Sequence, residues 1–182
     1  MFKIRIANEF VRNLVEWVLV IGVAILLALI IRNFVFRVTR VTGYSMNPTL
    51  NHGDILILNR FSYLFSSPKV GDIVAFPYPA GPDEFFIKRV VASSGDEVDL
   101  LYNRFYVNGT PLDDSFSEAN VIATGNVQFP ITVQDGYFFV LGDNRNASKD
   151  SRYNSVGNIN GNDMMGRSLI RVWPFASFGR VD

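Results

Sequence analysis

A turn-forming stretch, GYSMNPTL from Gly43 to Leu50, contains a serine whose surroundings suit nucleophilic chemistry. Pro48 has a fixed backbone φ, which favours a turn here and exposes the side chains just before it. Ser45 is therefore a candidate nucleophile, provided that a base lies within hydrogen-bond reach. The stretch is neither a GxSxG nucleophile elbow nor an SxxK motif, because Asn47 and Pro48 occupy the glycine and lysine positions. Considered alone, Ser45 is more simply one of the chain's many serines.

The segment FFIKRVV, Phe85 to Val91, supplies a candidate base. Successive side chains of a strand alternate between its faces, so Lys88 and Arg89 point in opposite directions and one of them must enter an apolar face. Burial disfavours the charged form of a lysine and lowers its pKa, whereas an arginine stays protonated. A buried Lys88 would be a neutral amine near neutral pH, able to take a proton from a serine hydroxyl. The alternative is an edge strand with both cations in water.

A third polar segment, LGDNRNASKDSRYNSVG from Leu141 to Gly157, follows an apolar run. Short hydrogen-bonding side chains are dense in it, which is typical of a loop that bonds to itself and braces a neighbouring element. Two alternatives stay open, a solvated surface loop and a calcium loop, the latter because acids and amides alternate. The spacing of an EF-hand loop is absent from this sequence.

Composition removes most other routes to hydrolysis. The 182 residues contain no cysteine and one histidine, which excludes thiol nucleophiles, disulfide frameworks and His- or Cys-rich metal sites. A Ser–His–Asp triad would have to use His52, which stands beside Gly53 and is expected to be a turn residue. Lys plus Arg and Asp plus Glu number 17 each, a balance that argues against a nucleic-acid-binding protein. Any hydrolase in this chain must therefore use a metal-free route, and we expect no cofactor.

An apolar segment precedes these motifs. Its central part, Trp17 to Ile31, carries no charge, and apolar residues extend it on both sides. This predicts a transmembrane anchor helix over residues 11–31 after a short N-terminal tail, residues 1–10. The bulky residues that follow, Arg32 to Phe36, do not form the small-x-small cleavage site of a removable signal peptide. A buried core helix is the alternative, which the lack of a polar face disfavours. Basic residues flank both ends equally, so charge counting leaves the orientation open.

The remaining residues, 38–182, are predicted to form an all-β body. Turn residues separate apolar runs of strand length, which are Ile55–Leu58, Ile73–Phe76, Phe85–Val91, Tyr102–Val107 and Tyr137–Leu141. Asn108-Gly109 predicts a type I′ hairpin turn. The prolines are expected between strands or on edges, namely Pro68, Pro77, Pro79, Pro82, Pro111 and Pro130. A polar loop is expected over residues 113–126.

The anchor and four motifs, in this order and spacing, resemble type I signal peptidases, most closely the short, single-anchor form of Gram-positive bacteria. The motifs are GYSMNPTL, GDIVAF (71–76), FIKRVVASSGDEV (86–98) and GDNRNASKDSRYNSVG (142–157), and the resemblance covers about residues 10–175. It implies an all-β catalytic domain of coiled sheets, the fold of self-cleaving stress-response repressors, behind one transmembrane helix. It also implies a Ser–Lys dyad with Ser45 as nucleophile and Lys88 as general base.

Supporting roles follow from the same resemblance. Ser148 matches a serine that hydrogen-bonds and orients the lysine, and a supporting polar network is matched by Asp150, Arg152 and Arg89. Gly43 stands where the Gram-negative form has a serine whose hydroxyl helps to bind the oxyanion. The Ser45 backbone N–H and a backbone approach at Gly43 are therefore expected to take part in an oxyanion hole that has no side-chain donor.

The implied activity is the removal of signal peptides from secreted preproteins, after small residues of the Ala-x-Ala type. The implied partners are preprotein signal peptides and cell membrane lipids, with the secretion translocon nearby and no nucleic acid. The implied location is the cell membrane, crossed once, with the N-terminus in the cytoplasm and the catalytic domain outside. Two aromatic segments, Phe61–Phe65 and Trp173–Phe175, either dip into lipid or pack in the core.

Two rival interpretations are weaker. A self-cleaving repressor would need an N-terminal DNA-binding domain, and this chain has an apolar segment there instead. A membrane-tethered binding module that has lost catalysis would not need both Ser45 and Lys88, and both are present.

Overall fold

The computed structural model describes residues 9–30, 35–113, 117 and 121–181. The chain divides into two compact units, Met1–Phe36 and Arg37–Asp182. The second unit corresponds to the predicted body, whose first strand starts two residues before the predicted residue 38.

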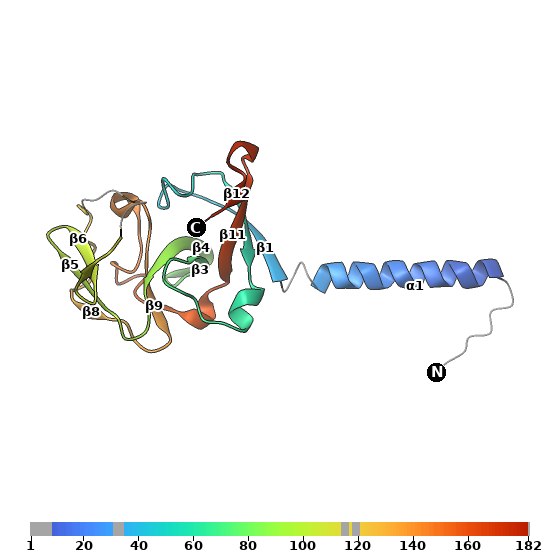
Figure 1. Ribbon diagram of the computed structural model, residues 1–182, viewed down its shortest axis with the longest axis horizontal. Helices are drawn as coiled ribbons and strands as arrows, with labels where there is room; N and C mark the ends of the chain where they lie inside the picture. The colour runs from blue at the N-terminus through green and yellow to red at the C-terminus, as the bar shows by residue number, and fades with distance from the viewer. Residues whose placement is uncertain (1–8, 31–34, 114–116, 118–120, 182) are drawn as a thin grey trace. The chain divides into compact units, whose positions relative to one another are not determined.

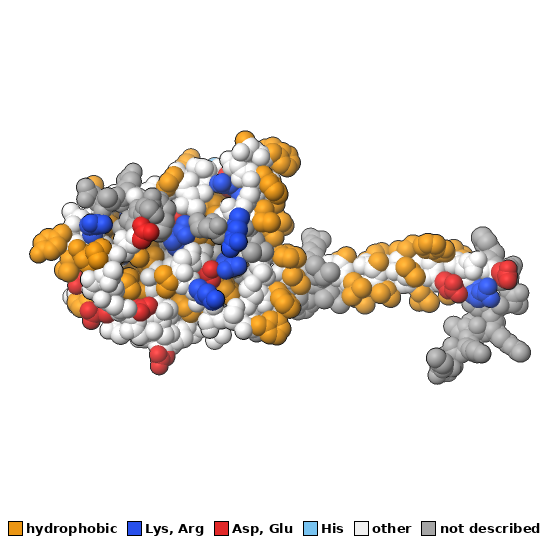
Figure 2. Space-filling model, viewed as in Figure 1, with side chains coloured by type: hydrophobic (Ala, Val, Ile, Leu, Met, Phe, Trp, Pro, Cys, Tyr) orange, Lys and Arg blue, Asp and Glu red, His pale blue; other side chains and the backbone are white. Residues whose placement is uncertain are grey.

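Among its described residues, the first unit contains one helix, α1 (Glu9–Ile30). Figure 2 shows hydrophobic side chains along it and charged ones gathered near its N-terminal end. The part from Val11 to Leu29 is long and apolar enough to cross a membrane, and none of it is buried inside the chain. This disfavours the alternative of a core helix. The helix begins two residues before the predicted start, and the predicted last residue, Ile31, lies outside the described residues.

The body is built on an eight-stranded sheet with the order β1-β2-β11-β3-β4-β9-β10, in which β12 also pairs with β11 (Figure 1). Its strands are β1 (Phe36–Arg40), β2 (Ile55–Asn59), β3 (Ile73–Tyr78), β4 (Gly81–Ala92), β9 (Tyr137–Leu141), β10 (Ile159–Asn160), β11 (Gly166–Trp173) and β12 (Gly179–Arg180). The predicted all-β class is confirmed. Because β4 lies between β3 and β9, the strand that carries the two candidate cations is central, and the edge-strand alternative is wrong.

A smaller sheet has the order β7-β6-β5-β8. Its strands are β5 (Glu97–Leu101), β6 (Arg104–Val107), β7 (Thr110–Pro111) and β8 (Ile131–Thr132). Asn108 and Gly109 join β6 to β7 with φ of 52° and 74°, so the predicted type I′ turn is confirmed. Tyr102 and Asn103 turn between β5 and β6 with φ of 50° and 61°, without a glycine to signal it. The predicted strand from Tyr102 therefore begins only at Arg104.

Two further differences concern strands. The central strand β11 was not predicted, because Arg167, Ser168 and Arg171 interrupt its apolar pattern. Pro77 in β3 and Pro82 in β4 lie inside central strands, contrary to expectation, whereas Pro111 lies in the edge strand β7, as expected. The pairing of β3 with β4 shifts register just after Pro77, as expected where a proline removes a ladder donor. In residues 113–126 the described positions contain no helix or strand, as predicted.

The main sheet is buried on both faces around β4 and β9. Neighbouring residues of these strands enter different hydrophobic clusters: Val90 and Val140 belong to one, and Val91 and Leu141 to another. A third cluster takes in residues from the loop between β1 and β2. Any charged side chain in the middle of β4 must therefore be buried, whichever face it occupies.

Candidate active site

Ser45 lies in the loop that joins β1 to β2. At the base of this loop, the Gly53 N–H donates to the Val41 carbonyl at 2.9 Å. The side chains of Met46 and Leu50 are buried in the core, and the Leu50 N–H donates to the Met46 carbonyl at 2.8 Å. The expected turn is therefore present, and it is pinned to the core immediately after the half-buried Ser45.

Lys88 reaches Ser45 from the middle of β4. Its Nζ donates to Ser45 Oγ at 2.8 Å and to the Ile87 carbonyl at 2.9 Å. The residue is 3% exposed, and burial lowers the pKa of Lys88 from its ordinary value of 10.5 to about 8, against the opposing charges of Asp150 and Asp143. Of the two alternatives left open by the sequence, the structure shows the one in which Lys88 is buried.

Arg89, the neighbouring cation, is also buried, at 5% exposure. Its Nε donates to Asp143 Oδ1 at 2.9 Å and its Nη2 to Asp143 Oδ2 at 2.8 Å, while Nη1 donates to the Gly71 carbonyl at 3.0 Å. Thr49 Oγ1 donates to the same carboxylate at 2.6 Å. Asp143 therefore neutralises an arginine that cannot lose its proton and joins β4 to the loop of Ser45.

A second buried ion pair lies in the segment after β9. Arg152 Nε donates to Asp150 Oδ1 at 2.7 Å and Nη2 to Oδ2 at 2.8 Å, and both side chains are fully buried. The arginine also donates to the carbonyls of Ser148 and Ala123, and the carboxylate accepts the Gly142 N–H at 3.0 Å. The segment thus bonds to itself, as predicted, and the solvated-loop alternative is wrong. The calcium-loop alternative is disfavoured, because arginines engage its buried carboxylates.

The smaller sheet reaches this segment through Phe105 of β6. The guanidinium carbons of Arg145 and Arg152 lie 5.6 and 6.0 Å from the centre of its ring. All three side chains are fully buried, so the ring supports two desolvated cations.

The same segment approaches Ser45 closely. The Asn144 N–H donates to the Ser45 carbonyl at 3.0 Å. A Cβ at Gly142 would collide with that carbonyl and with Ser148 Oγ, so a residue without a side chain is required here. Ser148 is buried, and within the described part of the chain its Oγ has no hydrogen-bond partner. The hydrogen bond from Ser148 to Lys88 that the resemblance implies is therefore not formed in this structure.

The backbone before Ser45 is held by the single histidine. Gly43 has φ of 94°, a conformation that favours glycine, and its N–H donates to His52 Nδ1 at 3.1 Å. His52 lies in a turn, as predicted, and its ring centre is 5.7 Å from that of Tyr44. Among the described residues the Ser45 N–H has no hydrogen-bond acceptor, so this donor is available to a ligand, whereas that of Gly43 is occupied.

A cleft of about 520 Å³ opens at Ser45 and Lys88. Residues 39–46 and 84–88 supply most of its lining, and Ala147 and Lys149 complete it. The lining includes parts of β1 and β4, and its size is in the range of ligand sites.

The structure thus gathers residues that are far apart in the sequence, with Ser45 and Lys88 in contact and two ion pairs next to them. Sequence reasoning missed Asp143 as the partner of Arg89, and it missed Thr49. One signal was present: two adjacent cations lie on one apolar strand, and an aspartate stands two residues after the apolar run of β9.

The profile of one protein family, described as signal peptidase, peptidase S26, matches residues 14–173. The chain belongs to this family. Three related proteins illustrate the likeness: signal peptidase I of Leptolyngbya laminosa is 36% identical, covering 92% of this chain and 84% of that protein. Signal peptidase I S of Bacillus subtilis is 33% identical, and the match covers 90% of this chain and 91% of that protein. Signal peptidase IB of Staphylococcus aureus is 31% identical, and the match covers 92% of this chain and 93% of that protein.

A crystal structure of a signal peptidase I from Enterococcus faecalis is also similar. It is 29% identical, covers 56% of this chain and 97% of its own, and has a TM-score of 0.45. The resemblance inferred from the four motifs is confirmed by the family profile and the relatives, and the chain is a peptidase of the family that removes signal peptides.

Proposed function

We propose that this signal peptidase cleaves preproteins with Ser45 as nucleophile and Lys88 as general base. One observation carries the proposal: Ser45 Oγ lies 2.8 Å from the Nζ of a lysine that is 3% exposed. With the pKa of Lys88 lowered to about 8, roughly a tenth of the lysine is neutral at pH 7. A neutral amine at this distance is able to accept the serine proton.

The proposed reaction has two halves. Neutral Lys88 takes the proton of Ser45 Oγ while this oxygen attacks the scissile carbonyl carbon, and the free Ser45 N–H donates to the oxyanion. The C–N bond then breaks, the Lys88 ammonium gives its proton to the leaving amine, and the signal peptide remains as an ester on Ser45. Water, deprotonated by Lys88, hydrolyses this ester and regenerates the free serine.

Positioning roles are proposed for the surrounding residues. Arg89 holds Asp143, and Arg152 holds Asp150, so that two buried carboxylates keep the loop of Ser45 and the segment after β9 in place. Ser148 has a buried, unpartnered hydroxyl beside Gly142, and we assign it to orienting Lys88 when the serine proton moves. Gly43 shapes the backbone that leads to the oxyanion donor.

The substrate is proposed to be the end of a signal peptide, cut after small residues of the Ala-x-Ala type. We place residues 1–10 in the cytoplasm, the anchor over residues 11–31 in the membrane and the body of residues 38–182 outside, near the translocon. The aromatic side chains expected either in lipid or in the core are exposed at Phe61, Phe65, Trp173 and Phe175. Core packing is therefore the wrong alternative for these four, and their exposure supports contact with lipid.

The test is cleavage of a fluorogenic peptide containing Ala-x-Ala by full-length protein in detergent. We expect Ser45→Ala to lose turnover entirely and Lys88→Met to lose at least about 10²–10⁴-fold in kcat, because a general base contributes this much. Ser177→Ala and Lys69→Met, which change exposed residues of the same types, should cleave like wild type. Substantial turnover by Ser45→Ala would rule out the assignment, and a Ser45→Ala protein that still serves the cell would favour the rival binding module.

Topology has its own test. Protease added to intact spheroplasts should digest the body and spare a tag placed at the N-terminus. The basic residues Lys3, Arg5 and Arg12 precede the uncharged stretch that begins at Trp17, and they resist transfer across the membrane. A body that stays protected in sealed cells would place Ser45 in the cytoplasm, away from exported substrates.

A further inference from the structure

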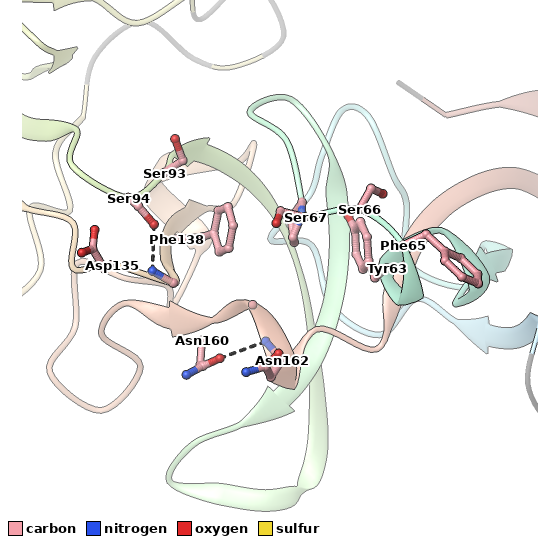
Figure 3. A pocket seen from close by; sticks show the side chains of 13 residues that line it. Tyr63, Phe65, Ser66, Ser67, Ser93, Ser94, Asp135, Phe138, Asn160 and Asn162 are labelled. Atoms are coloured by element: carbon pink, nitrogen blue, oxygen red, sulfur yellow. Dashed lines mark hydrogen bonds between the residues drawn. The ribbon is translucent and has the colours of Figure 1, made fainter.

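A second hollow, of about 810 Å³, shares no lining residue with the catalytic cleft. We call it the serine–asparagine hollow. It is lined by Tyr63, Phe65, Ser66, Ser67, Pro68, Ser93, Ser94, Asp135, Gly136, Phe138, Asn160, Gly161 and Asn162 (Figure 3). Its volume lies within the range of small-molecule sites. We propose that it binds a short neutral oligosaccharide.

The lining chemistry selects this class of ligand. Four serine hydroxyls, two asparagine amides and one carboxylate surround the hollow, and none of its lining residues is a lysine, arginine or histidine. An anionic ligand would therefore meet only the negative charge of Asp135, without a cation to compensate. A purely apolar ligand would leave these polar groups without hydrogen bonds on desolvation. A polyhydroxylated, uncharged ligand satisfies both conditions.

Apolar surface lies among these polar groups. Phe65 of the lining is 78% exposed, whereas the Phe138 ring, which Figure 3 shows between Ser94 and Ser67, is only 6% exposed. Tyr63 adds a third, half-buried aromatic ring. A sugar ring has C–H faces and hydroxyl edges, so its faces match the aromatic side chains and its edges match the polar ones.

Several polar groups of the hollow are uncommitted. Within the described part of the chain, the side chains of Ser67, Asp135 and Asn162 make no hydrogen bond. Asn160 Oδ1 accepts the Asn162 N–H at 2.9 Å, which leaves the Asn160 amide group free to donate. The hollow thus offers both donors and acceptors, and the Asp135 carboxylate is able to accept strong hydrogen bonds from neighbouring hydroxyls.

The hollow is also preorganised. The Gly136 N–H donates to Ser94 Oγ at 2.8 Å, and the Gly161 N–H donates to the Gly136 carbonyl at 2.9 Å. These bonds tie together the segments around residues 94, 136 and 161, which are distant in the sequence. Groups that are held in place before binding cost less entropy when a ligand arrives. This proposal uses the location proposed above: with the body outside the membrane, the hollow would bind the protein to extracellular glycans.

The experiment is a binding titration of the full-length protein in lipid nanodiscs, because glycoside detergents would compete for a sugar site. The probes are the trimer of N-acetylglucosamine and cellotriose, both neutral, and trigalacturonate as an anionic mismatch. We expect at least one neutral trimer to bind with Kd of about 1 mM or tighter, and trigalacturonate to bind at least about tenfold more weakly. Saturation-transfer NMR should show contact with the sugar C–H groups.

Variants locate the binding. Asp135→Ala and Asn162→Ala should each weaken binding of the neutral trimer about tenfold. The control is Asp163→Ala, which removes an exposed carboxylate next to the hollow but outside its lining and should leave binding unchanged. Peptide cleavage should be unchanged in all three, which separates this proposal from the catalytic one. The proposal is overturned if neither neutral trimer binds, if binding is insensitive to Asp135→Ala and Asn162→Ala, or if trigalacturonate or Ca²⁺ alone binds better than the sugars.

Discussion

The catalytic cleft and the serine–asparagine hollow use polar side chains in opposite ways. At the cleft, Lys88 and the neighbouring ion pair of Arg89 with Asp143 are almost completely buried, and each side chain is held by partners within the protein. In the hollow, Asp135 and Asn162 are exposed, and their side chains have no partner among the described residues. Charge burial in the cleft lowers the pKa of Lys88, whereas the carboxylate of the hollow stays in water.

The difference teaches what each region is built for. Proton transfer needs a base with a shifted pKa and a fixed position, which requires desolvation and a complete set of hydrogen bonds nearby. Recognition of a soluble ligand needs groups that can exchange water for the ligand, which requires that they be uncommitted. Mutations at the cleft should therefore reduce stability or peptide cleavage strongly, and mutations in the hollow should change both only slightly.

The largest expected effect comes from breaking a buried ion pair beside the cleft. Arg152→Met leaves the fully buried Asp150 without its partner and should lower the free energy of unfolding by about 3–5 kcal/mol. The matched control is Arg167→Met, because Arg167 pairs with Asp72 at 3.2 Å but is 34% exposed. This substitution should lower the free energy of unfolding by no more than about 1 kcal/mol. Thermal unfolding of the full-length protein in micelles measures both. Equal losses would show that burial does not distinguish the two ion pairs.

A smaller effect is expected from filling the close approach at Gly142. A Cβ there collides with the Ser45 carbonyl, so Gly142→Ala should displace the nucleophile and reduce kcat/KM by about 10²-fold. Gly95→Ala is the control. It has no neighbour within 4 Å, and its φ of 84° predicts only a loss of stability, by about 1 kcal/mol, with normal kinetics. Normal turnover by Gly142→Ala would show that the segment after β9 does not position Ser45.

The pH dependence tests the desolvation of Lys88. Its pKa of about 8 predicts that kcat/KM rises about tenfold from pH 7 to pH 9 and then levels off. Stability should follow the same group: between about pH 8 and 10.5 the unfolded state binds more protons at this lysine than the folded state does. Wild type should therefore gain stability relative to Lys88→Met as the pH rises through this window. A rate that still climbs steeply at pH 10 would mean that Lys88 is solvated.

The smallest effect is expected in the hollow. Asp135→Ala removes an exposed, unpartnered carboxylate and should change the free energy of unfolding by less than about 0.5 kcal/mol. Peptide cleavage should stay at the wild-type rate, since the hollow shares no lining residue with the cleft. A loss of more than about 1 kcal/mol would contradict the contrast between the two regions.

Much of the fold was predictable from local patterns. The apolar segment predicted α1 to within two residues at its start, and apolar runs of strand length predicted β2, β3, β4 and β9. The Asn108-Gly109 turn was predictable because its residues tolerate positive φ. Strand β11 was not, because polar residues interrupt its pattern and only its neighbours β2 and β3 show that it is central.

The candidate site divides in the same way. The sequence by itself determined which residues were available for chemistry: one serine on a turn, a lysine beside an arginine on an apolar strand, and no cysteine to compete. Only the tertiary structure decided that Lys88 meets Ser45, that Arg89 is buried as well, and that Asp143 neutralises it. The physical reason is that burial and pairing depend on strand order. The fold brings Lys88 to Ser45, 43 positions away in the sequence, and Arg89 to Asp143, 54 positions away. Residue types set the possible charges, and the environment sets which of them are ionised.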